Sequence, residues 1–198
     1  MFKGLFIVTC LLLGIHALPT ELSNATDASN ATAVGLTTSA SFTFTLDYLL
    51  YPQSCENICF SWYCNKGPRS VAPDRVNAKA HRASNSCGKS TPNRCSISKG
   101  HLPGYQCDEW PWASSTAGGA NAATRCIPAA DNTGSGSSWG NFINNKGPQA
   151  SGTVADGVLV DIKIINIPLT ARFCLGEIGL PVPGCTSDAG QPMLQQIG

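Results

Sequence analysis

The sequence predicts a small α+β domain with a small antiparallel sheet, a few short helices and loops that are stapled by disulfides. Three observations lead to this class. Two segments alternate apolar and polar residues as half-buried strands do, two others repeat apolar residues at helical spacing, and cysteines recur along the chain. The length of 198 residues favours a single domain.

Residues 1–17 have the composition of an export signal. Lys3 supplies a positive charge, and the apolar run from Phe6 to Leu13 is too short to span a bilayer. A signal anchor is the alternative interpretation. We expect a secreted protein without a membrane segment, since no later stretch is long and apolar enough to form a membrane helix.

Residues 18–39 are polar and of low complexity, which indicates a propeptide or a glycosylated tail. Asn24 and Asn30 both stand in an Asn-Ala-Thr pattern, which is a glycosylation acceptor in secreted chains. The folded domain is therefore expected to span residues 40–198.

The first half of this domain contains one clear strand and one clear helix. Residues 41–48 alternate cleanly and predict a half-buried strand, which Pro52 ends. Ser54 is a suitable cap for a helix over residues 55–64. Residues 65–105 lack periodicity and are expected to form a loop, except for a helical turn at residues 79–83.

The second half adds two strands and a helix. Residues 122–129 predict a short strand, and residues 136–145 predict a helix that carries Trp139 inward. Residues 157–167 give the clearest strand, because Val, Ile and charged residues alternate along it. The resulting order of strands and helices is that of an α+β domain.

The cysteines that remain once the leader with Cys10 is removed indicate disulfides, because the chain is exported. Their number is odd, so one thiol is expected to stay free or to pair with another chain. We expect Cys174 and Cys185 to pair, since they bracket a Gly/Pro-rich loop. A zinc site at residues 55–64 is the alternative. The candidates are Cys55, Cys59, Cys64, Cys87, Cys95, Cys107, Cys126, Cys174 and Cys185.

Basic residues concentrate between Asn65 and His101, although the net charge of the chain is only +1. This stretch contains a single acid, Asp74, so it is suited to neutralise phosphates. A solvated loop is the alternative interpretation. The candidate substrate-binding residues are Arg94 and Lys99 in this stretch, together with Arg125 and Asn141 further along the chain.

Asp108 and Glu109 are the first candidates for chemistry. Adjacent residues of an extended strand point to opposite faces, so the two carboxylates are predicted to have different roles. One would face the attacking water, and the other would ligate a metal ion or orient a basic side chain. A surface turn with two solvated acids is the alternative.

Asn132 is the second candidate, in a glycine-rich turn before the predicted helix. Its amide oxygen is a hard neutral donor that suits Mg²⁺. An ordinary Asp-Asn-x-Gly turn is the alternative. The histidines that follow the leader, His81 and His101, stand in no recognisable catalytic motif, so a role as general base is not favoured for either.

The segment Gly104-Tyr-Gln-Cys-Asp-Glu-Trp-Pro-Trp-Ala113 resembles the "GY…DEWP/DEYPFA" signature of the NucA/NucB-type deoxyribonucleases. The similarity continues with near-constant spacing through Gly118-Gly119, residues 128–132, Gly134, Gly136 and Gly140-Asn141.

The resemblance implies a ββα-metal-finger-like nuclease core in which an aspartate replaces the usual histidine base. Carried over, Asp108 is the general base, Asn132 is a metal ligand, and Glu109 takes part in catalysis as a ligand or as a partner of the ligands. The implied cofactor is one divalent cation, Mg²⁺ or Mn²⁺. The implied activity is that of a monomeric endonuclease that cuts double-stranded DNA with little sequence specificity.

Ala117 departs from the family pattern, since many relatives carry an acidic or amide residue just before the paired glycines. This departure leaves open a catalytically weak or inactive secreted relative that binds nucleic acid or acts as an interaction protein. A disulfide-rich toxin or structural protein with a chance motif is the remaining alternative.

Overall fold

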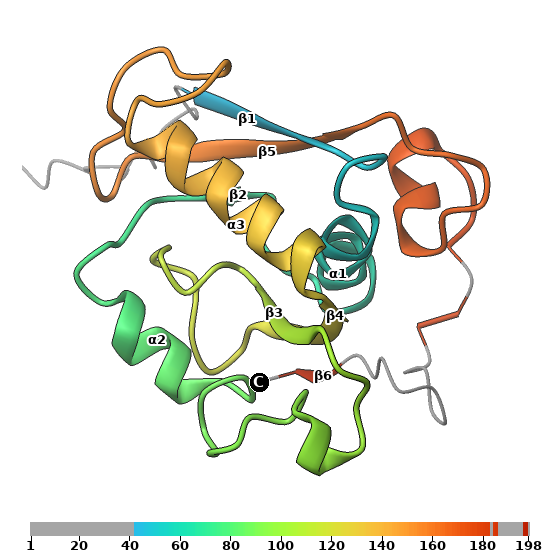
Figure 1. Ribbon diagram of the computed structural model, residues 1–198. Helices are drawn as coiled ribbons and strands as arrows, with labels where there is room; N and C mark the ends of the chain where they lie inside the picture. The colour runs from blue at the N-terminus through green and yellow to red at the C-terminus, as the bar shows by residue number, and fades with distance from the viewer. Residues whose placement is uncertain (1–41, 183, 186–195, 198) are drawn as a thin grey trace, which may run out of the picture. The chain divides into compact units, whose positions relative to one another are not determined.

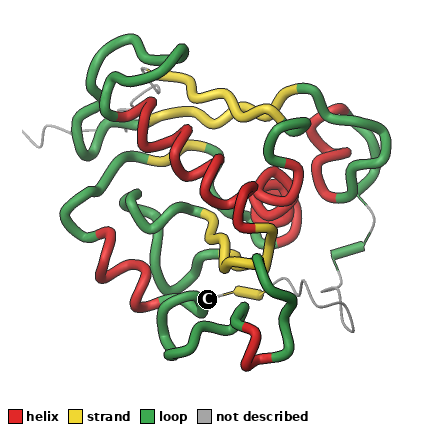
Figure 2. Tube along the Cα trace, in the orientation of Figure 1, coloured by secondary structure: helices red, strands yellow, loops and turns green. Residues whose placement is uncertain are grey.

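Figure 1 shows the computed structural model, which describes residues 42–182, 184–185 and 196–197. The expected signal at 1–17, the low-complexity segment at 18–39 and the glycosylation acceptors lie outside the described residues. Within the described part, short strands and helices alternate with long loops (Figure 2), as an α+β class requires.

The first sheet is mixed and has the strand order β1-β5-β2. β1 (Phe42–Asp47) and β5 (Val160–Ile165) confirm the predicted strands at 41–48 and 157–167. They run parallel to each other, whereas the short β2 (Ser70–Val71) is antiparallel to β5. The expected small antiparallel sheet does not describe this first sheet, which is mixed. Alternation marks the buried face of a strand but does not reveal the direction of its neighbour.

The second sheet is antiparallel and has the order β3-β4-β6. β3 (Tyr105–Trp110) pairs with β4 (Ala123–Pro128), which confirms the predicted strand at 122–129. β6 (Gln196–Ile197) pairs with β4. β4 continues directly into α3 (Ala129–Ile143), so β3, β4 and α3 form a ββα unit in chain order.

α3 begins at Ala129 and not at residue 136, where the sequence predicts its start. Glycine and asparagine are poor helix formers, so residues 132–136 resemble a turn. Tertiary packing overrides this preference. A Cβ atom at Gly134 would lie 2.4 Å from Cε1 of Tyr51, so the glycine allows the helix to approach that ring closely. Asn132 consequently lies in the first turn of a helix.

α3 lies between the β1-β5-β2 sheet and the β3–β4 pair (Figure 1). The aromatic ring of Phe44 in β1 has its centroid 5.9 Å from that of Trp112, 5.6 Å from that of Trp139 and 5.1 Å from that of Phe142. Trp112 stacks on Trp139 with a centroid separation of 4.8 Å. These contacts fix α3 against both sheets and therefore fix the position of its first turn.

The long segment before β3 is stapled by two disulfides. It contains α2 (Ala78–Ser84), which confirms the predicted helical turn at 79–83, and the 3₁₀ turn η1 (Ile97–Lys99). The Cys87–Cys107 bond ties this segment to β3, and the Cys95–Cys126 bond ties it to β4. These bonds hold a stretch that has few apolar residues of its own to bury.

Two further disulfides join α1 (Pro52–Cys64), which confirms the helix predicted at 55–64, to the C-terminal part of the chain. Cys59 pairs with Cys174 in the 3₁₀ turn η2 (Phe173–Ile178), and Cys64 pairs with Cys185. The expected Cys174–Cys185 bond is therefore wrong, because each of these residues faces a cysteine of α1.

Cys55 is the free cysteine among the described residues, and it is buried. The zinc alternative for residues 55–64 does not hold, since the sulfur atoms of Cys59 and Cys64 are bound in disulfides. Four disulfides are typical of a protein that matures in an oxidising compartment. Among the described residues, no helix has the length and apolar character needed to cross a bilayer.

The N-terminus of α1 is capped by a carboxylate of α3. The Gln53 and Ser54 backbone N–H groups donate to Oδ2 and Oδ1 of Asp131 over 2.8 and 3.2 Å. The hydroxyl groups of Ser54 and Ser135 lie 2.8 Å apart. Tyr51 at the N-cap position makes no side-chain cap, so Asp131 satisfies two N–H groups of the first turn and joins the two helices.

Replacement of Asp131 by alanine is expected to lower the free energy of unfolding by about 1–2 kcal/mol, the usual cost of losing a helix cap. Urea denaturation measures this loss. Asp161→Ala is the matched control, because Asp161 is exposed on β5 and accepts only a solvent-exposed hydrogen bond from the Ser70 hydroxyl among the described residues, so its loss is expected to cost no more than about 0.5 kcal/mol. Equal losses in the two variants would contradict the capping role.

Candidate functional site

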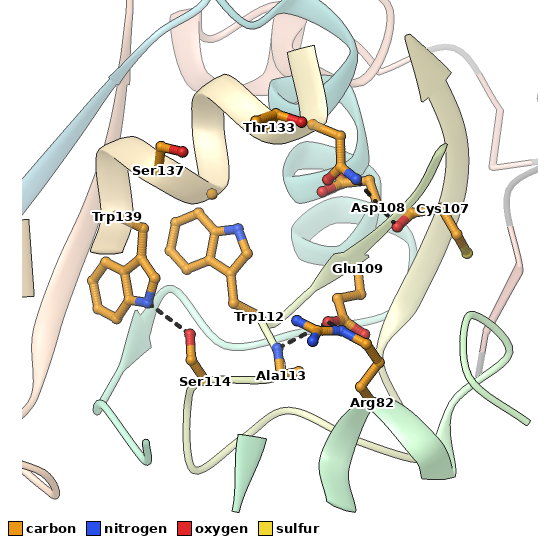
Figure 3. A pocket seen from close by; sticks show the side chains of 12 residues that line it. Arg82, Cys107, Asp108, Glu109, Trp112, Ala113, Ser114, Thr133, Ser137 and Trp139 are labelled. Atoms are coloured by element: carbon orange, nitrogen blue, oxygen red, sulfur yellow. Dashed lines mark hydrogen bonds and ion pairs between the residues drawn. The ribbon is translucent and has the colours of Figure 1, made fainter. Parts of the chain in front are cut away.

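A cavity of about 400 Å³ opens between α2, β3 and the N-terminal half of α3 (Figure 3). It contains the three residues that the sequence singled out for chemistry. Its lining residues are Arg82, Cys107, Asp108, Glu109, Trp112, Ala113, Ser114, Asn132, Thr133, Gly136, Ser137 and Trp139.

Asp108 lies in β3 and is only 3% exposed. The side-chain amide of Asn57 in α1 donates a hydrogen bond of 2.8 Å to Oδ2 of Asp108. Burial raises the pKa of Asp108 to about 7; the hydrogen bond from Asn57 opposes this shift, and the charges of Asp131 and Glu109 add to it. A carboxylate with such a pKa is suited to accept a proton at neutral pH.

Glu109 faces α2 and has different partners from its neighbour. Its Oε1 atom accepts hydrogen bonds of 3.3 Å from Nε of Arg82 and from the backbone N–H of Ala113, and its Oε2 atom accepts one from the side-chain amide of Asn85. The two adjacent carboxylates therefore do contact different elements. Glu109 holds Arg82 at the edge of the cavity, where Figure 3 shows both side chains.

Asn132 presents its amide nitrogen to β3. Its Nδ2 atom donates to Oε1 of Gln106 over 3.0 Å and to the carbonyl oxygen of Cys107 over 3.4 Å. In the part of the chain that the structure describes, no group donates a hydrogen bond to Oδ1 of Asn132. The amide nitrogen is thus bound to the strand, and a hard oxygen is left for a ligand.

Both candidate substrate-binding arginines, Arg94 and Arg125, are buried or partly buried in the fold. Arg125 stands opposite Asp108 in the β3–β4 pair and is buried, and burial lowers its pKa. Arg94 donates a 2.6 Å hydrogen bond to the carbonyl oxygen of Thr124, and burial lowers its pKa to about 10. Neither guanidinium group lines the cavity.

The remaining candidates also lie away from the cavity wall. Lys99 is exposed on η1, and Asn141 is exposed on α3 beyond the residues that line the cavity. Nδ1 of His81 lies 2.9 Å from the carbonyl oxygen of Ala113, and Nε2 of His101 lies 3.7 Å from Sγ of Cys126. Neither histidine lines the cavity.

Several residues of the site were not found from the sequence. Arg82 belongs to the basic stretch between Asn65 and His101, which was predicted to bind phosphates, but nothing in the sequence distinguished it from the other basic residues there. Asn57 and Asn85 are single amides in unremarkable surroundings, and only the folded chain brings them to Asp108 and Glu109. Trp139 was expected to point into the core, and it also lines the cavity.

A metal ion at this cavity would have few protein ligands. Among the described residues, no group of three or more His, Cys, Asp or Glu side chains is arranged to hold a metal ion. Mg²⁺ commonly keeps several water molecules and takes only one or two protein ligands together with substrate phosphates. The donor set of the cavity is compatible with such a hard cation.

The comparison with protein families identifies the segment that forms this cavity. Residues 58–153 match the family described as Deoxyribonuclease NucA/NucB, and they include Asp108, Glu109 and Asn132. Over this segment the chain is similar to that family, and the resemblance carried by residues 104–113 is confirmed. Such a family indicates a DNase and therefore DNA as the partner. No curated protein matches the chain.

Asp108→Asn is expected to make the protein more stable at neutral pH. An unfolded aspartate titrates at about 3.9, whereas Asp108 has its pKa raised to about 7 in the folded protein. The folded state therefore binds this proton more tightly, and the native protein loses stability as the pH rises from about 4 to about 7. The uncharged amide avoids this loss.

Urea unfolding in buffers with chelator should therefore show a difference between the two proteins that grows over this pH range, with the variant more stable at pH ~8. Asp161→Asn serves as the control for the loss of an exposed carboxylate. Parallel pH dependences for Asp108→Asn and the native protein would show that Asp108 titrates in the ordinary range.

Proposed function

We propose that the protein is a secreted, metal-dependent endonuclease that hydrolyses phosphodiester bonds of double-stranded DNA with little sequence specificity. The main support for this proposal is one cavity, lined by both Asp108 and Asn132, within the segment that matches a DNase family. The ββα order of β3, β4 and α3 agrees with a metal-finger-like core. The four disulfides support export.

The cavity suits one divalent cation, Mg²⁺ or Mn²⁺. Asn132 would hold it through Oδ1, and the carboxylates of Asp108 and Glu109 make the wall attractive to a positive charge. Glu109 already accepts three hydrogen bonds, so we assign it to the positioning of Arg82 more readily than to the cation. A bound cation would supply positive charge to the phosphate and to the leaving oxygen of the scissile bond.

Asp108 is the proposed general base. Its carboxylate would accept a proton from the water molecule that attacks the phosphorus atom. An exposed aspartate is a weak base at neutral pH, whereas burial raises the pKa of Asp108 to about 7. At this pKa a large fraction of the groups is ionised at neutral pH, and each is a stronger base than an exposed carboxylate.

Arg82 is the proposed contact to the DNA backbone. Its side chain is 62% exposed and is oriented by Glu109, so part of its guanidinium group is accessible at the edge of the cavity. Lys79 is exposed on the same helix, three positions before Arg82, and therefore on the same side. Contacts to phosphate oxygens carry no base information, which agrees with low sequence specificity.

The alternative of an inactive relative was motivated by Ala117. This residue is exposed in the turn before Gly118 and is not among the residues that line the cavity. The cavity wall keeps Asp108, Glu109 and Asn132 with an alanine at this position. We accordingly favour the enzyme over a protein that only binds nucleic acid.

Cleavage of plasmid DNA is expected with Mg²⁺ or Mn²⁺ and is expected to stop when EDTA is added. Asp108→Asn should lower the rate by at least about a hundredfold, because general-base catalysis contributes on the order of 10²–10⁴. Agarose gel assays of the purified secreted protein measure both effects. Asp161→Asn is the matched control and should cut normally. Full activity of Asp108→Asn would remove Asp108 from the role of base.

Asn132→Ala is expected to raise the metal concentration needed for half-maximal cleavage by about ten- to a hundredfold, since a direct ligand would be lost. A titration of cleavage rate against Mn²⁺ concentration measures this change. Asn144→Ala is the control, because Asn144 is an exposed amide at the C-terminal end of the same helix. An unchanged metal requirement in Asn132→Ala would exclude this amide as a ligand.

A further inference from the structure

Asn57 contacts the proposed base from α1, at a position just before the matched segment. It is fully buried in α1 and immediately precedes residues 58–153, over which the family similarity extends. Its Nδ2 atom donates to Oδ2 of Asp108 over 2.8 Å and to the carbonyl oxygen of Ala123 in β4 over 3.3 Å. One amide group thus joins α1 to both strands of the β3–β4 pair at the position of the carboxyl group.

The helix that carries Asn57 is held on several sides. Asp131 caps its first turn, and Cys59 binds it covalently to Cys174. The carboxylate of Glu56 accepts hydrogen bonds from the backbone N–H groups of Arg172 and Phe173 over 2.8 and 2.7 Å. α1 is therefore prevented from rotating or sliding, so the amide of Asn57 has a fixed position before any substrate arrives.

A buried amide is costly unless it forms hydrogen bonds, and an apolar residue of similar size would fill the same space without that cost. A neutral N–H donor has a specific advantage beside a base. It fixes the orientation of the carboxylate, yet it lowers the proton affinity less than the full positive charge of a lysine or arginine would. The amide of Asn57 can therefore orient the carboxylate of Asp108 and still leave it basic.

We propose that Asn57 is a positioning residue for the cleavage reaction, which acts by holding the carboxylate of Asp108 in the orientation that accepts a proton from the attacking water. This role rests on the proposed function. It requires that loss of the Asn57 donor slow the chemical step and leave DNA binding intact, because Asn57 is buried behind β3 and does not line the cavity.

The test compares three variants of the full chain in steady-state cleavage of a fluorescent DNA duplex with saturating Mn²⁺. Asn57→Leu removes the donor and keeps a similar volume, and Asn57→Asp keeps the shape but replaces the donor by a second carboxyl group. Ser54→Ala is the matched control. It removes the buried hydroxyl that contacts Ser135 and Asp131 from the same helix, and it leaves the contact between Asn57 and Asp108 in place.

Both Asn57 variants are expected to lower kcat by about ten- to a hundredfold, the usual effect of a misoriented catalytic group, with KM for the duplex within about threefold of the native value. Asn57→Asp should be the slower of the two, because a like charge is placed against Asp108. Ser54→Ala should keep kcat within about twofold, even where its urea midpoint falls as far as that of Asn57→Leu.

Two outcomes would overturn the role of Asn57 alone. One is a kcat of Asn57→Leu that stays within about twofold of the native value, and the other is an equal loss of kcat in Ser54→Ala, which would assign the effect to a loosened helix. A native protein that cuts no DNA with any divalent cation would instead refute the proposed function, and this role with it. The activity of the native protein therefore distinguishes the two failures.

Discussion

The hydrogen bonds made by the first turn of α3 connect the three elements on which the cavity depends. Asp131 caps α1, and the adjacent Asn132 donates to the backbone of β3 at Cys107. From α1, Asn57 reaches back to Asp108 in β3. These contacts form a closed arrangement in which α1, β3 and α3 position one another. Because the partners are buried or partly buried, their polar groups would be costly to leave unpaired, which stabilises this geometry against others.

On the α2 side of the cavity, disulfides hold the chain in place where a larger apolar core would otherwise do so. The helix α2 itself buries no residue. The Cys87–Cys107 bond nevertheless holds the segment that contains α2 beside β3, so that Asn85 and Arg82 meet Glu109. A surface loop thereby acquires a defined position at the site. Such stapling is typical of exported domains, which retain their disulfides outside the cell.

The buried carboxyl group of Asp108 illustrates a conflict between stability and chemistry. Burial disfavours its ionised form, and the nearby carboxylates of Asp131 and Glu109 increase the effect. An apolar residue at this position would avoid the loss of stability that comes from burying a charge. A carboxylate that must accept a proton benefits from the raised pKa that the same burial causes. The family match covers the same residues and independently points to DNA cleavage. The hydrogen bond from Asn57 partly relieves the cost without adding a counter-charge.

Local patterns in the sequence were sufficient to predict β1, β5, β4, α1 and α2, because alternation, helical spacing and capping residues act over a few positions. The motif around Asp108 and the amide of Asn132 also predicted which residues would share a cavity. The parallel pairing of β1 with β5, the early start of α3 and the pairing of cysteines were decided only by tertiary structure. So were the partners Asn57 and Asn85. Each of these features depends on groups far apart in the chain, whose approach is governed by packing and burial and leaves no local signal in the order of residues.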